Sequence, residues 1–244
     1  MFEIRSYAET GSTNDDAIAL LGRTEGLGIA LVADYQRAGK GRRARNWIAP
    51  PGSSLLLTVV LPNPVPSSSL WAVPFWTALA VAEGIERETS LRVDLQWPND
   101  LLLEARKCCG ILCVSRVIGD HAWVACGSGI NVLRPRADQI LATVEPPPAF
   151  LSDRTPDISR RSLLEAILRA YDSMLDELNR PEDIARAWER RAGLDGTPYR
   201  LLVDGSDAPF EAIARRLSDD GSLIVDDGSS ERRISLADAR VLRT

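Results

Sequence analysis

The pattern of apolar residues changes at Gly193, and this change divides the sequence into two parts. Before it, continuous apolar runs such as 28–35 alternate with stretches of helical periodicity, which predict buried strands and packed helices. After it, short runs of alternating apolar and polar residues are separated by Asp-Gly pairs, which are hairpin-turn signals. We therefore expect an α+β fold, with a mixed β-sheet and packed helices in residues 1–194 and a small β-barrel in residues 195–244.

Punctuation by glycine and proline places the individual elements. In the first part, the predicted strands are 28–35, 54–61, 92–96, 101–103, 107–117 and 121–132. The predicted helices are 15–21, 70–88, 159–178 and 181–191. Residues 145–156 contain four prolines and are expected to be an irregular connection. In the second part, the predicted strands are 199–203, 210–217, 222–225 and 232–236.

Composition excludes several classes of function. The chain has one histidine, His121, so a metal site built from several histidines is excluded. The net charge of −5 argues against nucleic acid as a partner. No apolar run approaches the ~20 residues that span a bilayer, and the N-terminus lacks the features of a signal peptide, so we expect no membrane association.

The four cysteines are Cys108, Cys109, Cys113 and Cys126, and they form no CxxC pair. We expect free thiols packed as small apolar residues, as is usual in a reducing cytoplasm. The alternative, a bridge between the adjacent Cys108 and Cys109, would be strained. A cytoplasmic location is therefore the expectation from cysteine usage.

A basic loop with two glycines follows the first predicted strand. Five positive charges fall between Arg37 and Arg45, with no acidic residue among them. The loop is not a dinucleotide-binding turn, because no helix follows it, and Gly39-Lys40-Gly41 lacks the residues that flank a Walker A lysine. Backbone N–H groups and arginine side chains at such a loop can hold a phosphate or carboxylate, which is the interpretation we favour. A solvated basic loop without a ligand remains the alternative.

A second group of polar residues interrupts the later strands. Trp97-Pro98-Asn99-Asp100 lies between two short strands, Lys107 opens the next strand, and Gly110 lies inside it. Among 29 basic residues only Lys40 and Lys107 are lysines, and both lie beside these unusual segments. A compact ammonium differs from a planar guanidinium, so a site could require Lys107 specifically. The alternative is a simple turn with lysines placed by chance.

These motifs, in this order, resemble the biotin–protein ligases (biotin–[acetyl-CoA-carboxylase] ligases). The resemblance covers about residues 6–132, and the small C-terminal β module is similar to the SH3-like domain of that family. It is carried by Ser12-Thr13-Asn14, Asp34-Tyr35-Gln36, Gly39-Lys40-Gly41-Arg42-Arg43, Trp47, Trp97-Pro98-Asn99-Asp100, Lys107, Gly110 and Gly127-Ser128-Gly129-Ile130-Asn131. It implies a class II synthetase-like catalytic domain.

The resemblance also implies a reaction in two steps. Biotin and ATP, with Mg²⁺, would give biotinyl-5′-adenylate and pyrophosphate. A lysine of the biotin carboxyl carrier protein of acetyl-CoA carboxylase would then attack the adenylate and release AMP. Carboxylate and phosphate are both anions, so cations that offset their repulsion would lower the barrier to the first step.

Site residues follow from the resemblance motif by motif. The residues expected to bind biotin are Ser12, Thr13, Asn14, Gln36, Gly39, Lys40, Gly41, Arg42, Trp47, Lys107, Gly110, Leu112 and Gly127. Those expected to bind the nucleotide are Arg42, Arg45, Trp97, Asn99, Lys107 and Asn131, with the segment 146–152 as a flap over adenine. Lys107 and Arg42 would be catalytic, and Asp100 would orient the incoming lysine. No protein residue is assigned to a metal.

The chain departs from the family pattern at two places. Lys40 stands where many relatives carry arginine, which matters only if that side chain, rather than the backbone, contacts the ligand. The Ser-Thr-Asn motif begins at residue 12, which leaves no room for an N-terminal winged helix-turn-helix, so we expect no operator binding. A lipoate–protein ligase and a nucleic-acid-binding module remain alternatives. A homodimer through an exposed strand edge also remains open.

Overall fold

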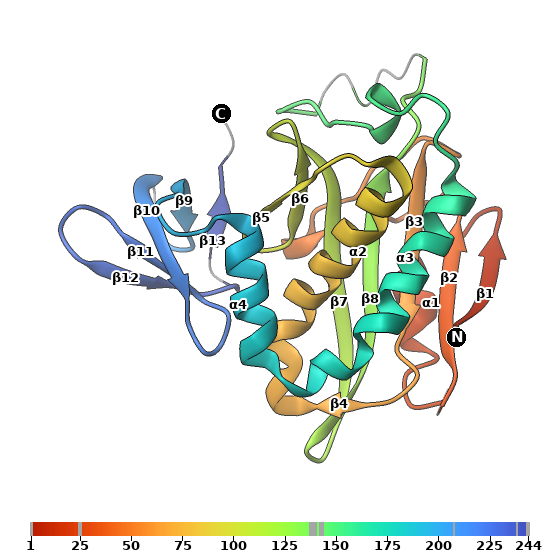
Figure 1. Cartoon of the computed structure of the whole chain (residues 1–244), viewed down its shortest axis with the longest axis horizontal. Coiled ribbons are helices and arrows are strands. Elements are labelled where there is room, and N and C mark those ends of the chain that lie inside the picture. Colours follow the sequence, from red (N-terminus) through yellow and green to blue (C-terminus); the bar gives the residue numbers. More distant parts are fainter. Residues whose placement is uncertain are drawn as a thin grey trace.

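The protein contains two β-sheets, with helices packed mainly on the larger one (Figure 1). This description comes from a computed structural model and covers residues 2–23, 26–136, 141, 144–206, 208–237 and 239–242. The larger sheet is mixed and the smaller one is antiparallel. The expected α+β class is confirmed.

The larger sheet has eight strands in the order β1-β2-β3-β8-β7-β6-β5, with β4 paired to β8. Their bounds are β1 Phe2–Tyr7, β2 Gly28–Ala33, β3 Ser54–Val60, β4 Val65–Pro66, β5 Asp94–Gln96, β6 Asp100–Leu103, β7 Arg106–Ile118 and β8 His121–Asn131. Among the described strands of this sheet, only β1 and β2 pair in parallel. The strand β1 was not predicted, because as a mostly exposed edge strand it lacks the apolar run of a buried one.

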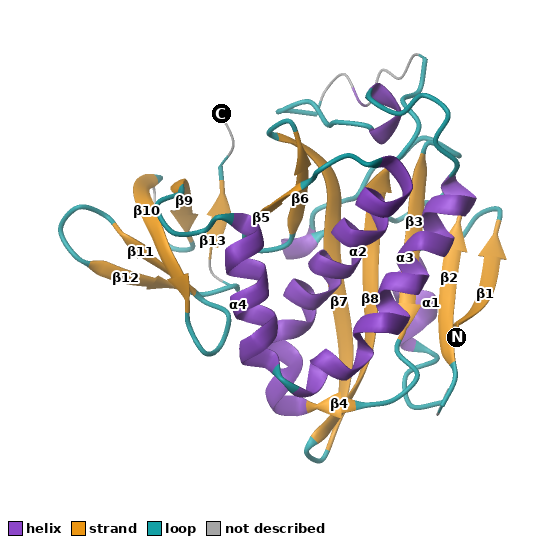
Figure 2. Cartoon of the chain, in the orientation of Figure 1, coloured by secondary structure: helices purple, strands orange, loops and turns teal. Residues whose placement is uncertain are grey.

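Helices cover both faces of this sheet, with α2 and α3 on one face and α1 on the other (Figure 2). Their bounds are α1 Thr13–Ile18, α2 Val73–Thr89, α3 Arg160–Met174 and α4 Pro181–Ala192. Alternation along β3 explains its burial, because Leu57 joins the core under α2 and α3 while Val60 packs with Ala17 of α1. Within the described ranges, none of the helices has the length and apolar character needed to cross a bilayer.

The predicted helices are confirmed, with shifted ends. The helix predicted from residue 70 begins as a 3₁₀ turn at Ser67–Ala72, and Pro74 lies in the first turn of α2, where a missing N–H is tolerated. The helix predicted over 159–178 becomes α3 followed by a 3₁₀ turn at Leu175–Asn179. The Ser159 side chain caps α3 by accepting hydrogen bonds from two backbone N–H groups.

The smaller sheet is formed by the C-terminal residues in the order β12-β11-β10-β9-β13. Its bounds are β9 Pro198–Val203, β10 Phe210–Leu217, β11 Leu223–Asp226, β12 Glu231–Ile234 and β13 Ala239–Val241. The short β13 was not predicted. Helix α4 ends at Gly193, which adopts the left-handed conformation (φ 56°). The boundary expected after residue 194 lies in the connection to β9, and we propose it as the division between two domains.

Hydrogen bonds join the smaller sheet to the rest of the chain. The backbone N–H of Trp97 donates to the Tyr199 hydroxyl (3.2 Å), and its indole Nε1 donates to the Gly221 carbonyl (3.1 Å). A Glu189 carboxylate oxygen on α4 accepts from Leu217 N at 2.5 Å. Because Trp97 is completely buried, the junction is part of the main core.

Candidate functional site

A cavity of about 260 Å³ lies on the α1 face of the larger sheet. It is bounded by the start of α1, the loop after β2, the middle of β3 and the paired strands β7 and β8. Apart from the flap 146–152, of which Pro146 and Pro148 line the cavity, all the residues expected at the site line it except Gly39 and Trp97. Those that do are Ser12, Thr13, Asn14, Gln36, Lys40, Gly41, Arg42, Arg45, Trp47, Asn99, Asp100, Lys107, Gly110, Leu112, Gly127 and Asn131.

One end of the cavity is neutral and polar, and its side chains are fixed by hydrogen bonds. The Gln36 Oε1 atom accepts from both the backbone N–H (2.7 Å) and the hydroxyl (2.9 Å) of Thr13. The Asn14 amide donates to the Leu112 carbonyl at 2.9 Å, and its Oδ1 atom lies 2.7 Å from the Thr58 hydroxyl. Ser12 is the N-cap residue of α1, makes no side-chain capping bond and is 2 % exposed. This end presents amide and hydroxyl groups that are already oriented.

Three glycines form the floor of the cavity. Gly110 and Gly129 are directly paired across β7 and β8, and Gly127 lies two residues before Gly129 on the same face. A Cβ atom at Gly129 would lie 2.5 Å from the Trp47 ring, and one at Gly127 would lie 2.2 Å from Asn14 Oδ1. A side chain at either position would therefore displace Trp47 or Asn14. Glycine is required here because these two side chains lie close to the backbone of β8.

The opposite end of the cavity carries charge. Lys107 Nζ lies 2.6 Å from Asp100 Oδ1 and 5.3 Å from the centre of the Trp47 ring. Arg42 donates to Asn99 Oδ1 at 3.2 Å, and the Asn99 amide donates to the Ile111 carbonyl at 2.6 Å. Burial lowers the pKa of the Arg42 guanidinium, although the nearby Asp100 carboxylate opposes this. Two cations and one carboxylate thus converge beside the glycine floor.

The basic loop closes on itself and contacts the smaller sheet. Its ends are joined by a hydrogen bond from Trp47 N to Gly39 O (2.9 Å). Arg42 donates to the Leu236 carbonyl, and Arg43 forms an ion pair with Asp204. The left-handed conformation of Arg43 (φ 59°) is uncommon for a residue with a side chain. The loop is therefore held from both parts of the chain.

Two residues expected at the site do not line the cavity. Trp97 does not reach the cavity, because its ring is fully buried at the junction with the smaller sheet. Gly39 is not among the lining residues. A Cβ atom there would come within 2.4 Å of the Trp47 carbonyl, so glycine at this position allows the two ends of the basic loop to approach each other. Lys40 lines the cavity, but its ammonium pairs with Asp15 at 2.6 Å, and both side chains are about half exposed.

Some lining residues were not anticipated from the sequence. Thr58 is completely buried, and its hydroxyl lies within 2.8 Å of both Asn14 Oδ1 and Thr13 Oγ1. A threonine inside the apolar run 55–60 of β3 was the available signal. Val144 was not anticipated either. It forms a wall near Asn131 together with Pro146 and Pro148, which belong to the segment 146–152 that was expected as a flap. Among the described residues, no group of three His, Cys, Asp or Glu side chains could hold a metal ion.

The arrangement suits a ligand with an uncharged polar head and an anionic tail. A head group at the Asn14 end would meet oriented hydrogen-bonding groups, and an anion at the other end would meet Lys107 and Arg42. Gly127 and Asn131 are four residues apart along β8, so the floor extends for roughly 13 Å. The cavity can therefore bring two bound groups together along one strand.

Comparisons with known proteins place the chain among ligases. Residues 15–131 match the model of the Biotin/lipoate A/B protein ligase family. The chain is 30 % identical to the biotin--[acetyl-CoA-carboxylase] ligase of Paracoccus denitrificans, over 89 % of this chain and 92 % of that protein. It is also 28 % identical to the bifunctional ligase/repressor BirA of Escherichia coli. That match covers 88 % of this chain but only 66 % of the longer relative.

A solved structure is similar along the whole chain. The biotin protein ligase from Aquifex aeolicus in complex with biotin and ATP superposes with a TM-score of 0.78. The match covers 99 % of each chain at 21 % identity. At that level of identity the likeness establishes the fold.

Proposed function

The chain belongs to the biotin–protein ligase family, and from this premise we propose that it attaches biotin to the biotin carboxyl carrier protein in an ATP-dependent reaction. In the first step a carboxylate oxygen of biotin attacks the α-phosphorus of ATP, the bond to the β-phosphate oxygen breaks, and pyrophosphate leaves. In the second step a lysine amine of the carrier attacks the carbonyl carbon of the adenylate. The bond to the phosphate oxygen breaks, AMP leaves and the amine loses a proton.

The observation that carries this proposal is the single cavity that joins a neutral polar end to a cationic end. We assign the ring system of biotin to the end built by Ser12, Thr13, Asn14 and Gln36. Its ureido group both donates and accepts hydrogen bonds, and this end offers amide and hydroxyl groups of both kinds. The glycine floor and the Trp47 ring would enclose the apolar tail.

Lys107 and Arg42 would act on the two anions that must meet in the first step. Their charges offset the repulsion between the carboxylate and the α-phosphate and stabilise the charge that develops on the departing pyrophosphate. A carboxylate is already a nucleophile, so this step needs no general base. That agrees with the position of His121, which lies exposed at the β7–β8 turn and pairs with Asp120.

Asp100 lies where it can serve both steps. Its ion pair fixes the Lys107 ammonium beside the cavity. In the second step, its carboxylate would orient the amine of the carrier lysine. Mg²⁺ accompanying ATP would offset phosphate charge, and it would be held mainly by phosphate and water oxygens. The Asn99 amide oxygen already accepts from Arg42, and Asp100 Oδ1 already pairs with Lys107.

The expectations about cellular location, DNA binding and dimer formation stay proposals. Free thiols at Cys108, Cys109, Cys113 and Cys126 suit a reducing cytoplasm. Duplex DNA is not expected to bind, and a homodimer through the β1 edge would be detected by light scattering. Specific binding of a DNA duplex at physiological salt would contradict the expectation about DNA.

Biotin-dependent exchange between ATP and pyrophosphate tests the function directly. The family model covers both biotin and lipoate ligases, so lipoate is the matched comparison substrate. We expect exchange with biotin and at least hundredfold less with lipoate, followed by transfer of biotin to the carrier protein. Exchange with lipoate alone would indicate a lipoate ligase. No exchange with either would refute the assignment.

A further inference from the structure

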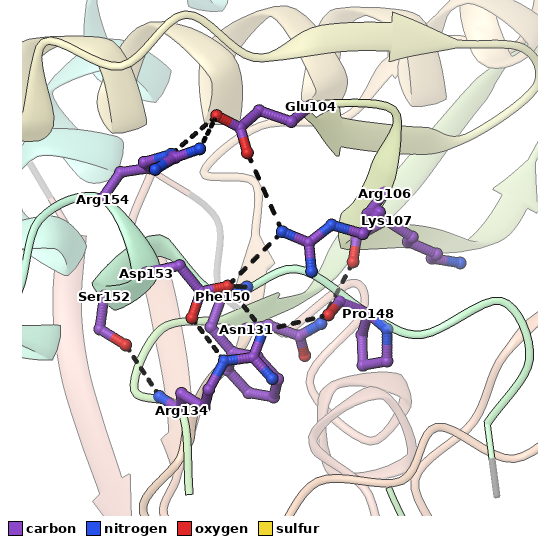
Figure 3. A network of polar contacts seen from close by, with 10 residues as sticks. All are labelled: Glu104, Arg106, Lys107, Asn131, Arg134, Pro148, Phe150, Ser152, Asp153 and Arg154. Atoms are coloured by element: carbon purple, nitrogen blue, oxygen red, sulfur yellow. Dashed lines mark hydrogen bonds and ion pairs between the residues drawn. The ribbon is translucent and has the colours of Figure 1, made fainter. Parts of the chain in front are cut away.

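A network of ion pairs and hydrogen bonds connects Pro148 to charged residues outside the cavity (Figure 3). Pro148 lines one wall of the cavity together with Pro146. The centre of the network is Asp153, whose carboxylate faces Arg134 from the segment after β8. The two residues form a bidentate pair, with distances of 2.5 Å from Nε to Oδ1 and 2.6 Å from Nη2 to Oδ2. Neither residue lines the cavity, so any effect on the reaction must pass through others.

The wall has an unusual need for such support. Residues 146–148 are three consecutive prolines, which have no backbone N–H groups and cannot donate hydrogen bonds to a sheet or a loop. The first donors after them are the N–H groups of Ala149 and Phe150. Ala149 N donates to the Lys107 carbonyl at 3.0 Å, and Phe150 N donates to Asp153 Oδ2 at 3.1 Å. The wall is thus anchored at its downstream end.

The pair of Asp153 and Arg134 adds contacts from the other side. Arg134 Nη2 lies 3.4 Å from the Pro148 carbonyl, and its guanidinium stacks 4.7 Å from the centre of the Phe150 ring. Phe150 itself is 1 % exposed, so the ring is fixed in the core. The hydrogen bond from Arg134 lowers the pKa of Asp153, so its carboxylate stays ionised to a lower pH than an ordinary aspartate.

The anchor leads back to the reacting groups. The Lys107 carbonyl that receives Ala149 N also lies 3.4 Å from the Asn131 amide nitrogen. The proline wall is therefore held against the backbone of the residue whose ammonium we assign to the first step. It lies at the Asn131 end of the glycine floor, away from Asn14, so it would border a bound nucleotide rather than the head group of biotin.

We propose that Asp153, together with Arg134, is a positioning residue for ATP: it holds the proline wall against Lys107 and so sets the affinity for the nucleotide but not for biotin. This inference rests on the proposed function and adds a residue that the family motifs do not contain. A wall released from its anchor would have to be ordered again by each bound nucleotide, and that cost would weaken binding. The chemical step would change less, because Lys107 and Arg42 remain in place.

Asp153→Asn tests the proposal, since it removes the charge and one acceptor while keeping the shape. We expect KM for ATP in the exchange assay to rise at least fivefold, kcat to change less than threefold, and the biotin Kd from calorimetry to stay within twofold. Arg134→Gln should give the same split, whereas Asp153→Glu should recover part of the ATP affinity. Glu165→Gln is the matched control, because it removes an exposed carboxylate that pairs with Arg161 within α3. Its KM for ATP should stay within twofold of the unaltered protein.

The outcomes separate cleanly. An unchanged KM for ATP in both Asp153→Asn and Arg134→Gln overturns the proposal. Equal losses of ATP and biotin affinity, with a lower melting temperature, would show a purely structural role and overturn it as well. If Asp153→Asn does not fold, the Arg134→Gln measurement decides. An intact protein that shows no exchange would refute the proposed function instead, which is a different result from an active protein with an unaffected variant.

Discussion

Lys107 and Asp100 form an ion pair inside the cavity, with Nζ 2.6 Å from Oδ1 and both side chains less than a third exposed. Partial burial strengthens such a pair and fixes its geometry. The cation assigned to the first step therefore has a defined position beside the cavity, set by a carboxylate on the neighbouring strand β6. Arrival of an anionic ligand would give Lys107 a second partner without moving it far.

Lys107→Ala should reduce kcat for biotin-dependent pyrophosphate exchange at least hundredfold. Removing one preorganised charge that stabilises the transition state commonly has an effect of roughly 10²–10³. Lys107→Arg should recover only part of the rate, because a planar guanidinium cannot take the place of a compact ammonium in contact with Asp100 and Trp47. Full activity of the alanine variant would remove Lys107 from the mechanism.

Asp100→Asn should slow the second step more than the first. The experiment isolates the adenylate on the enzyme and then measures single-turnover transfer to the carrier protein. We expect transfer to slow at least tenfold, since an amide cannot take up or orient a proton as a carboxylate does. A full transfer rate would contradict the assigned role and leave Asp100 as a partner of Lys107 alone.

Gly127→Ala should weaken biotin binding at least tenfold. The added Cβ would lie 2.2 Å from Asn14 Oδ1 and 2.8 Å from the Leu112 carbonyl, so Asn14 must leave its position. Gly11→Ala is the matched control, because a Cβ there meets no atom within 4 Å. Calorimetric titration with biotin measures both variants. Equal affinities would show that Asn14 does not contact biotin.

Thr58→Val should weaken biotin binding and lower stability at the same time. Valine keeps the volume but leaves Asn14 Oδ1 without the hydroxyl now 2.7 Å away, at a cost of about 1–3 kcal/mol for a buried acceptor. The control is Thr77→Val, which is equally buried but lies in α2 on the opposite face of the sheet. We expect the control to lower the melting temperature without changing the biotin Kd.

The sequence predicted the architecture well wherever burial or turn chemistry left a strong pattern. The strands β2, β3, β7 and β8 are such cases, because continuous apolar runs and a Gly-Asp turn mark them. The strands β1 and β13 were missed, since edge strands and very short strands carry little apolar signal. Propensity also could not show that the helix start at residue 70 is a 3₁₀ turn.

The site was predictable where a motif carried it and unpredictable where only packing decides. The position of Trp97 shows the limit, because its motif gives no sign that the ring turns into the junction with Gly221. Thr58 and Asp153 show the converse. Thr58 meets Asn14, and Asp153 meets Arg134, only after segments far apart in the chain have come together. Long-range pairing of this kind leaves no local pattern in the sequence.

Tyr199→Phe should change how stability depends on pH. Burial raises the pKa of Tyr199 to about 12, whereas a phenol in the unfolded chain titrates near 10. Between these values the unfolded chain loses the proton and the folded chain keeps it. The free energy of unfolding therefore falls as pH rises through this window, by about 1.4 kcal/mol per pH unit from this residue. The phenylalanine variant lacks this contribution.

At pH 8 the variant should be less stable by about 1 kcal/mol, because the Trp97 backbone N–H loses its bond to the hydroxyl. The difference should shrink and then reverse by about pH 11. Urea unfolding at pH 8, 9, 10 and 11 measures it, with Tyr7→Phe as a control at an exposed site. Other buried acids, such as Cys108, affect both proteins alike and cancel in the difference. Parallel stability curves for the variant and the unaltered protein would show that the Tyr199 phenol is not shifted.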